Sequence, residues 1–205
     1  MKENQLEDYY LYLEQLQTKV DKFFKQQEPY IFCKEGCAHC CEEGQFPCSE
    51  LEFSFLELGF MGLDDEVKDK ILEKTRALRT IKEKTPDEVL QCECPFLINK
   101  KCSAYQFRPI ICRTFGIPFY DAKGKLKVPF CNEFGLNYSQ VYDRERNVLS
   151  EELYKKTGFS QEPLAYNLSL SFLIGKVGKE GMKLDFGEQR MITDWMIDYL
   201  NQIEE

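Results

Sequence analysis

Cysteine is concentrated in two short blocks of this chain, and that clustering limits the possible folds more than any other feature of the sequence. The first block places four of the ten cysteines within residues 33–41, around Gly36. Cysteines that only fill a core are scattered, whereas clusters with short spacers beside Gly and Pro are typical of metal ligands. We therefore predict a metal site built from both blocks, which contain Cys33, Cys37, Cys40 and Cys41 in the first and Cys92, Cys94, Cys102 and Cys112 in the second.

The spacing of the first block restricts how it can bind a metal. In a regular helix its four thiols would share one face within an arc of about 100°, but over a rise of about 12 Å. One tetrahedral metal with Zn–S bonds of about 2.3 Å cannot span that rise, so a regular helix favours two metals or partial ligation. We favour a break at Gly36, with Cys33 on a loop and Cys37, Cys40 and Cys41 on the first turn of a helix. Free N–H groups at a helix start also favour thiolates.

Composition excludes several classes of function. The chain has 205 residues and a formal net charge of −8, which argues against binding nucleic acid or an anionic membrane through bulk charge. No apolar run approaches the roughly 20 residues of a membrane span, and the polar start at residues 1–5 precedes no signal-peptide core. We expect a cytoplasmic protein, without a membrane partner, whose cysteines stay reduced.

Apolar periodicity and capping signals predict mostly helices. The segment 49–58 begins with a capping box from Ser49 to Glu52, buries Leu58 and is closed by Gly59 and Gly62. A second capping box at 185–188 begins the last helix, and residues 85–88 form a short helix start. The predicted helices cover residues 3–27, 49–58, 64–84, 150–156, 163–174 and 185–203.

Small hairpins are predicted over residues 95–102 and 119–130, and a helical turn interrupted at Pro109 lies over 103–112. The first hairpin brings Cys94 close to Cys102. The fold class is therefore mainly α: a single helical domain over residues 1–205, with one or two small β-hairpins around a multi-cysteine metal site. Its cysteine-cluster core covers about 32–131, flanked by the N-terminal helix 3–27 and the C-terminal helices 150–203.

Few residues offer catalytic chemistry. His39 is the only histidine and would point away from the thiols on a helix, so we expect it to be exposed rather than a ligand. General-base chemistry with Ser or Cys therefore has few candidates, and no phosphate-binding glycine loop or dinucleotide motif is present. Arg108 and Arg113 lie beside the second block, where a guanidinium can offset thiolate charge or donate hydrogen bonds to sulfur.

The paired blocks resemble the YkgJ-like cysteine-cluster family, also named CxxCxxCC and described as zinc- or iron-chelating. The resemblance covers about residues 32–116 and includes Tyr105, Arg108-Pro109 and Cys112-Arg113. It implies an intracellular metal-binding protein and a metal-ligand set of Cys33, Cys37, Cys40, Cys41, Cys94, Cys102 and Cys112. Cys48, Cys92 and Cys131 fall outside the pattern.

Seven thiols are too many for one tetrahedral metal. One Cys₄ centre with spare thiols, two metals with a bridging thiolate, and an iron–sulfur cluster with a second site all stay open, since sulfur ligation suits zinc and iron alike. The cofactor is therefore zinc or iron, including an iron–sulfur cluster, with a slight preference for iron.

Three functions are compatible with this pattern. The first is a metal-binding protein whose centre is structural or handles metal. The second is a redox or protein-modifying enzyme, because the cluster is similar to one in flagellin lysine N-methylases. The third is a helical interaction scaffold stapled by a structural metal, with an unknown protein partner.

Overall fold

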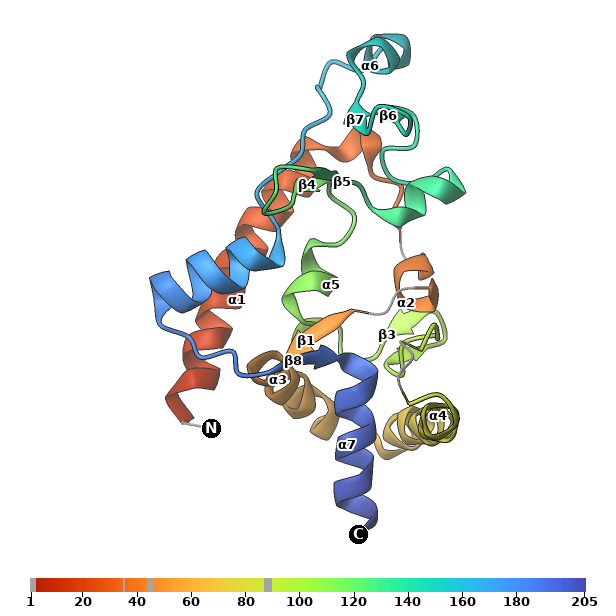
Figure 1. Ribbon diagram of the computed structural model, residues 1–205, viewed down its shortest axis with the longest axis vertical. Helices are drawn as coiled ribbons and strands as arrows, with labels where there is room; N and C mark the ends of the chain where they lie inside the picture. Colours follow the sequence, from red (N-terminus) through yellow and green to blue (C-terminus); the bar gives the residue numbers. More distant parts are fainter. Residues whose placement is uncertain (1–2, 35, 44–45, 87–89) are drawn as a thin grey trace. The chain divides into compact units, whose positions relative to one another are not determined.

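The computed structural model describes residues 3–34, 36–43, 46–86 and 90–205, and its ribbon is shown in Figure 1. The chain divides into two compact units. The first unit consists of Met1–Glu35 and Arg113–Asp185, and the second of Gly36–Cys112 and Phe186–Glu205. The cysteine-rich core predicted over 32–131 is thus shared between two units, and the prediction of one domain stays a prediction.

The first unit is organised on its long N-terminal helix. Tyr9, Leu13, Leu16 and Val20 form the buried stripe of this helix, and the Tyr12 hydroxyl donates to the Leu173 carbonyl (2.9 Å). The elements of the unit are α1 (Glu3–Gln26), η1 (Glu28–Tyr30), β4 (Phe119–Tyr120), β5 (Leu126–Lys127), η3 (Phe130–Phe134), β6 (Tyr142–Asp143), β7 (Val148–Leu149), α6 (Glu151–Thr157) and the π-helical η4 (Ser171–Gly181).

The second unit carries most of the cysteines. Its elements are α2 (His39–Glu43), β1 (Pro47–Ser49), α3 (Glu50–Met61), α4 (Asp65–Lys84), β2 (Leu97–Ile98), β3 (Lys101–Cys102), η2 (Tyr105–Phe107), β8 (Gln189–Met191) and α7 (Ile192–Glu204). The short helix α5 (Ile110–Thr114) contains the point where the chain passes back to the first unit.

A two-stranded antiparallel ladder joins the two chain segments of the second unit. β1 pairs antiparallel with β8, which places Cys48 opposite Arg190 and brings together segments from the two ends of the unit (Figure 1). Beside it, α7 packs along α4. Apolar side chains then fill one core, whose buried members are Cys48, Phe53, Leu56, Phe60, Ile71, Phe96, Ala104, Ile192 and Met196. Cys94, Cys102 and Cys112 lie half-buried against this core, so the core supports the second cysteine block.

The prediction of a mainly α fold with small hairpins is confirmed. Helix α1 ends one residue before the predicted limit, α4 follows Asp64, and α6 is capped by the Ser150 side chain and followed by Gly158 at φ +72°. Both predicted hairpins are present, as β2–β3 and β4–β5, and η2 and α5 lie on either side of Pro109. The helix start predicted at 85–88 falls mostly on residues outside those described.

The starts of two predicted helices are wrong because backbone pairing over long distances overrides their local signals. In the segment 163–174, the Tyr166 N–H donates to the Pro118 carbonyl (2.9 Å), which keeps that part extended, and helical structure begins only near Ser171. The capping box at 185–188 starts no helix, because the next residues form β8 and α7 begins at Ile192. The hairpin β6–β7 was not predicted.

The end of α3 was also predicted wrongly. The capping box of Ser49 and Glu52 is present, but the helix continues to Met61 and leaves Leu58 half exposed. Gly59 lies inside the helix, where its missing side chain admits Phe107, and only Gly62 caps the end. A glycine that makes room for a neighbour cannot be told from a terminating glycine by sequence alone.

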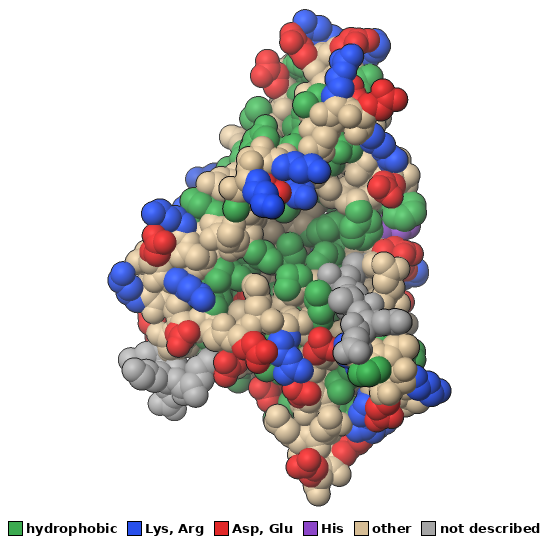
Figure 2. Space-filling model, viewed as in Figure 1, with side chains coloured by type: hydrophobic (Ala, Val, Ile, Leu, Met, Phe, Trp, Pro, Cys, Tyr) green, Lys and Arg blue, Asp and Glu red, His purple; other side chains and the backbone are tan. Residues whose placement is uncertain are grey.

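The surface carries mixed charge. Figure 2 shows acidic and basic side chains interspersed over the visible face. Among the described helices, none is both long enough and apolar enough to cross a bilayer.

The contact between Gly59 and Phe107 gives a first test. A Cβ at Gly59 would lie 2.7 Å from Phe107 Cβ, so Gly59→Ala should lower the free energy of unfolding by about 1–3 kcal/mol despite the better helix propensity of alanine. At Gly62 the nearest atom would be 3.6 Å away, so Gly62→Ala is the matched control and should be neutral or slightly stabilising. Urea denaturation measures both variants, and equal effects would contradict this packing.

Candidate metal centre

The first cysteine block turns from loop to helix. Gly36 adopts φ +86°, a conformation that favours glycine, and Cys33 precedes it on a loop as predicted. The Ala38 carbonyl accepts from the Cys41 N–H (2.8 Å) and starts α2. Cys37 was placed on the first helical turn, but it precedes the helix, because α2 begins only at His39. Cys40 and Cys41 are on that turn, with their sulfur atoms 3.9 Å apart.

The second block is held by the β2–β3 hairpin. Asn99 and Lys100 both have positive φ, as a two-residue turn between twisted strands requires. Leu97 pairs with Cys102, and the Leu97 N–H donates to the Cys94 carbonyl (3.0 Å). The predicted hairpin is therefore present, and its hydrogen bonds hold the backbone at Cys94 and Cys102.

A buried carboxylate positions α5, which carries Cys112. Glu52 is 1% exposed, and one of its oxygens accepts from the Ile110 N–H (2.9 Å) at the start of α5. Its other oxygen accepts from the Ser49 N–H (2.9 Å) and hydroxyl (2.7 Å). Burial raises the pKa of Glu52, while these hydrogen bonds oppose that shift. The sequence identified Glu52 only as part of a cap, and its second role depends on a residue 58 positions away.

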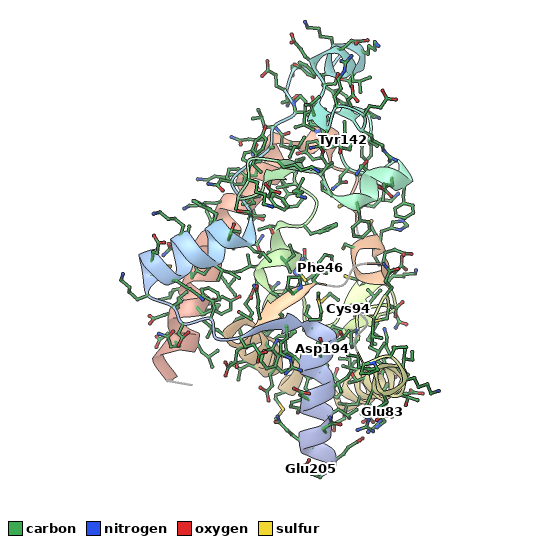
Figure 3. All side chains as sticks on the ribbon, viewed as in Figure 1. Phe46, Glu83, Cys94, Tyr142, Asp194 and Glu205 are labelled. Atoms are coloured by element: carbon green, nitrogen blue, oxygen red, sulfur yellow. The ribbon has the colours of Figure 1, made fainter. Side chains whose placement is uncertain are left out.

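The two blocks meet through their backbones. The Cys94 N–H donates to the Cys41 carbonyl (2.8 Å), and Lys100 forms an ion pair with Glu42. Figure 3 labels Cys94 together with Phe46, both of which border the core of the second unit. None of the ten cysteines forms a disulfide, so no disulfide joins the blocks.

The thiols of the two blocks interact electrostatically. A hydrogen bond with Cys41 lowers the pKa of Cys40 to about 7, and the same bond together with burial raises the pKa of Cys41. Burial raises the pKa of Cys94 to about 12 and also raises the pKa values of Cys102 and Cys112. Negative charge on one of these sulfurs opposes charge on the next, since Cys94 raises the pKa of Cys41 and of Cys112.

Two cations of the second unit contact the second block. The Arg108 guanidinium stacks on the Tyr105 ring (3.5 Å to the centroid) and donates to the Cys112 carbonyl (3.4 Å). Its charge adds to the lowering of the Cys40 pKa and partly opposes the rise in the pKa values of Cys102 and Cys112. Lys74 on α4 donates to the carbonyls of Cys94 (3.2 Å) and Leu97 (2.6 Å) and pairs with Glu93. Sequence reasoning identified Arg108 but missed Lys74, which lies far away along the chain.

The donor set has the chemistry that zinc and iron prefer. Two thiolates on one tetrahedral metal with bonds of about 2.3 Å lie about 3.8 Å apart, close to the separation of the Cys40 and Cys41 sulfurs. Among the described residues, however, no group of three or more Cys, His, Asp or Glu side chains is arranged as a ready metal-binding set. A thiol turns about a single side-chain torsion, so ligation on this backbone requires rotation of several thiols.

The remaining predicted residues are distributed over both units. Cys33 is exposed in the first unit, where its sulfur accepts a hydrogen bond from the Asn137 amide (3.1 Å). Arg113, predicted to bond to sulfur, donates to the Gln17 side chain (3.1 Å), and its bond to sulfur stays a prediction. His39 is partly exposed beside Glu42 (3.9 Å).

Three cysteines do not belong to the predicted ligand set. Cys48 is fully buried, and this burial raises its pKa, with smaller contributions from the charges of Glu52, Cys112 and Cys94. Cys92 precedes Cys94, and Cys131 is buried in η3 of the first unit. Cys48 was not predicted as a neighbour of the thiols, because only the β1–β8 ladder places it there.

An open cavity of about 760 Å³ lies in the first unit, between the β4–β5 turn and η4. Its charged groups are already satisfied within the protein. Asp121 accepts from the N–H groups of Lys123 and Lys125 (both 2.9 Å), and Lys176 pairs with Glu180 (3.0 Å). The described residues that line the cavity therefore present no unpaired charge that would indicate a ligand.

Comparison with known proteins supports the metal-binding interpretation. Residues 32–132 match the family CxxCxxCC, described as "Putative zinc- or iron-chelating domain". The match extends beyond the predicted limit of 116 and includes Cys131. No curated protein and no solved structure matches the chain.

The role of Glu52 can be tested by substitution. Glu52→Ala leaves three buried donors of Ser49 and Ile110 without their acceptor, so it should lower the free energy of unfolding by about 3 kcal/mol. Glu73→Ala, at an exposed position of α4, is the control and should change stability by less than about 0.5 kcal/mol. Denaturant titration of the metal-free protein measures both, and a near-neutral Glu52→Ala would rule out this anchoring.

Proposed function

We propose that the CxxCxxCC domain of this chain binds zinc or iron through cysteine thiolates and that the bound metal holds its two cysteine blocks together. The proposed ligands are Cys33, Cys37, Cys40, Cys41, Cys94, Cys102 and Cys112. The centre is structural or serves metal handling, and a bound metal would supply positive charge where several thiolates gather.

One observation carries this proposal. The hydrogen bond from the Cys94 N–H to the Cys41 carbonyl brings together two segments more than fifty residues apart, each with further cysteines outside any disulfide. Reduced thiols in such number are poorly explained as core packing, because they lie half-buried at the edge of the core rather than inside it. The description of the family matches this donor chemistry.

The proposed centre has no assigned substrate. The hypothesis of a redox or protein-modifying enzyme depends on likeness of the cluster alone, and the scaffold hypothesis requires a partner that the sequence does not identify. A structural centre and a catalytic centre respond differently to metal loss. Loss of a structural metal destabilises the second unit, whereas loss of a catalytic metal leaves its fold intact.

Metal binding is tested with a ligand variant and a matched control. We expect the full chain, purified without oxygen, to contain zinc or iron by elemental analysis. Cys112→Ser should lose most of that metal, and Cys131→Ala, which removes a cysteine outside the proposed set, should retain it. An unchanged metal content in Cys112→Ser would contradict the ligand set, and a metal-free wild type under these conditions would contradict the function.

Metal removal should also lower stability. A ligand at 1,000 times its Kd stabilises the folded state by about 4 kcal/mol, which corresponds to about 10 °C in Tm for a chain of this size. Calorimetry with and without a chelator measures this change. An unchanged Tm after verified metal loss would contradict a structural centre.

Arg108 supplies a test of charge balance. Arg108→Gln removes the cation that favours ionised Cys40, Cys102 and Cys112, so zinc affinity should fall about 10-fold or more. Arg108→Lys keeps the charge but loses the planar stacking on Tyr105, so its zinc affinity should lie between that of Arg108→Gln and that of the wild type. Competition with a chromophoric chelator measures the affinities, and equal loss in both variants would show that charge is not the cause.

A further inference from the structure

A buried amide in the first unit contacts the first cysteine of the first block. Asn137 has no exposed surface, and its Nδ2 donates both to the Cys33 sulfur (3.1 Å) and to the Gly116 carbonyl (3.0 Å). Its Oδ1 accepts from the Phe32 N–H (2.8 Å). One side chain therefore holds the backbone before Cys33 and the thiol of Cys33 together, and all these groups belong to the same compact unit.

The surrounding chain keeps this amide in place. The Tyr138 N–H donates to the Tyr30 carbonyl (3.0 Å), and the two rings stack with centroids 5.5 Å apart. Gly116 lies on the opposite side at φ +109°, where a Cβ would approach Asn137 Nδ2 to 3.0 Å. The local backbone therefore leaves room for the amide and fixes its direction.

The acceptor of this hydrogen bond is a cysteine sulfur, which distinguishes the contact from ordinary core packing. A neutral thiol is a weak acceptor, whereas a thiolate bound to a metal keeps negative charge and accepts hydrogen bonds strongly. Hydrogen bonds to metal ligands fix their orientation and commonly affect metal affinity. A fully buried N–H directed at an exposed cysteine is the arrangement expected of such a bond.

We infer that Asn137 is a positioning residue for Cys33: its amide orients the sulfur for metal binding and donates a hydrogen bond to the metal-bound thiolate. Asn137 lies outside the residues that match the family, so the family pattern does not include it. The inference rests on the proposed function, because it requires Cys33 to be a metal ligand.

The experiment compares variants of the full chain: Asn137→Ala, Cys33→Ser, the double variant and Asn132→Ala. Asn132 is the matched control, because its side chain is also a buried amide. Its Nδ2 donates to the Pro129 carbonyl (2.7 Å) rather than to a sulfur. Two readouts are taken: the affinity for Zn²⁺, with ferrous iron in a parallel anaerobic series, and the alkylation rate of Cys33 in the reduced, metal-free protein.

We expect Asn137→Ala to weaken metal affinity about 10-fold to 100-fold and to change the alkylation rate of Cys33. In the Cys33→Ser background the same substitution should cause no further loss of affinity, and Asn132→Ala should change neither readout. Asn137→Asp keeps the acceptor for the Phe32 N–H but removes both donors, and it replaces Asn137→Ala if that variant unfolds.

An equal loss of affinity in the Cys33→Ser background would show that Asn137 acts through the fold alone and would overturn the inference. The same conclusion holds if Asn132→Ala matches Asn137→Ala in both readouts. Failure of the proposed function looks different, because then the wild type binds neither metal. In that case an unchanged alkylation rate in Asn137→Ala would overturn the positioning role as well.

Discussion

The hydrogen bond between the Cys94 N–H and the Cys41 carbonyl is the contact on which the candidate centre depends. It is a backbone bond, so it fixes where the two cysteine blocks meet whatever their side chains do. A backbone donor withdrawn from water needs a partner, and here that requirement links two segments that are distant in sequence. Thiols near this contact consequently influence one another's pKa values before any metal is considered.

This mutual influence has an electrostatic consequence. Burial disfavours thiolate at Cys94, Cys102 and Cys112, and each charged sulfur would further disfavour the next. Without a metal, most of these groups are therefore neutral thiols, which border the apolar core at little cost. A divalent metal reverses this preference, because its charge replaces the protons. The same cluster can thus exist as an apolar edge of the core or as a ligand set.

The supporting charges act on the backbone more than on the sulfurs. Glu52 binds the N–H group that begins α5, and Lys74 binds the carbonyls of Cys94 and Leu97. Both side chains hold the segments that carry the cysteines, and neither is one of the proposed ligands. Arg108 combines the two roles, since it binds the Cys112 carbonyl and also favours ionised sulfur. Fixed backbones with rotatable thiols explain how the blocks can be well placed although the described residues hold no preformed ligand geometry.

Those parts of the site whose conformation depends on neighbouring residues could be predicted from the sequence. The position of Cys37 could not. The break at Gly36, the hairpin within 95–102 and the break at Pro109 each act within a few residues, and all three are present as expected. The predictions failed where a distant partner decides the outcome. Tyr166 is held extended by Pro118, Gly59 is required by Phe107, and β8 exists only because β1 is beside it. Cys48, Lys74 and Asn137 were missed for the same reason.

The position of Cys37 shows how the ligand geometry depends on backbone conformation. Had it been on the first turn of α2, three thiols would have been fixed by one short helix, and the ligand set would have been largely determined by local spacing. Because α2 begins at His39, only Cys40 and Cys41 are fixed in this way, and Cys37 lies on the loop after Gly36. The backbone of a loop residue can adjust to a metal, whereas the backbone of a helical pair is fixed. The sulfur separation of Cys40 and Cys41 is close to that of two ligands on one tetrahedral metal, so this helical pair suits the proposed centre without a change of backbone.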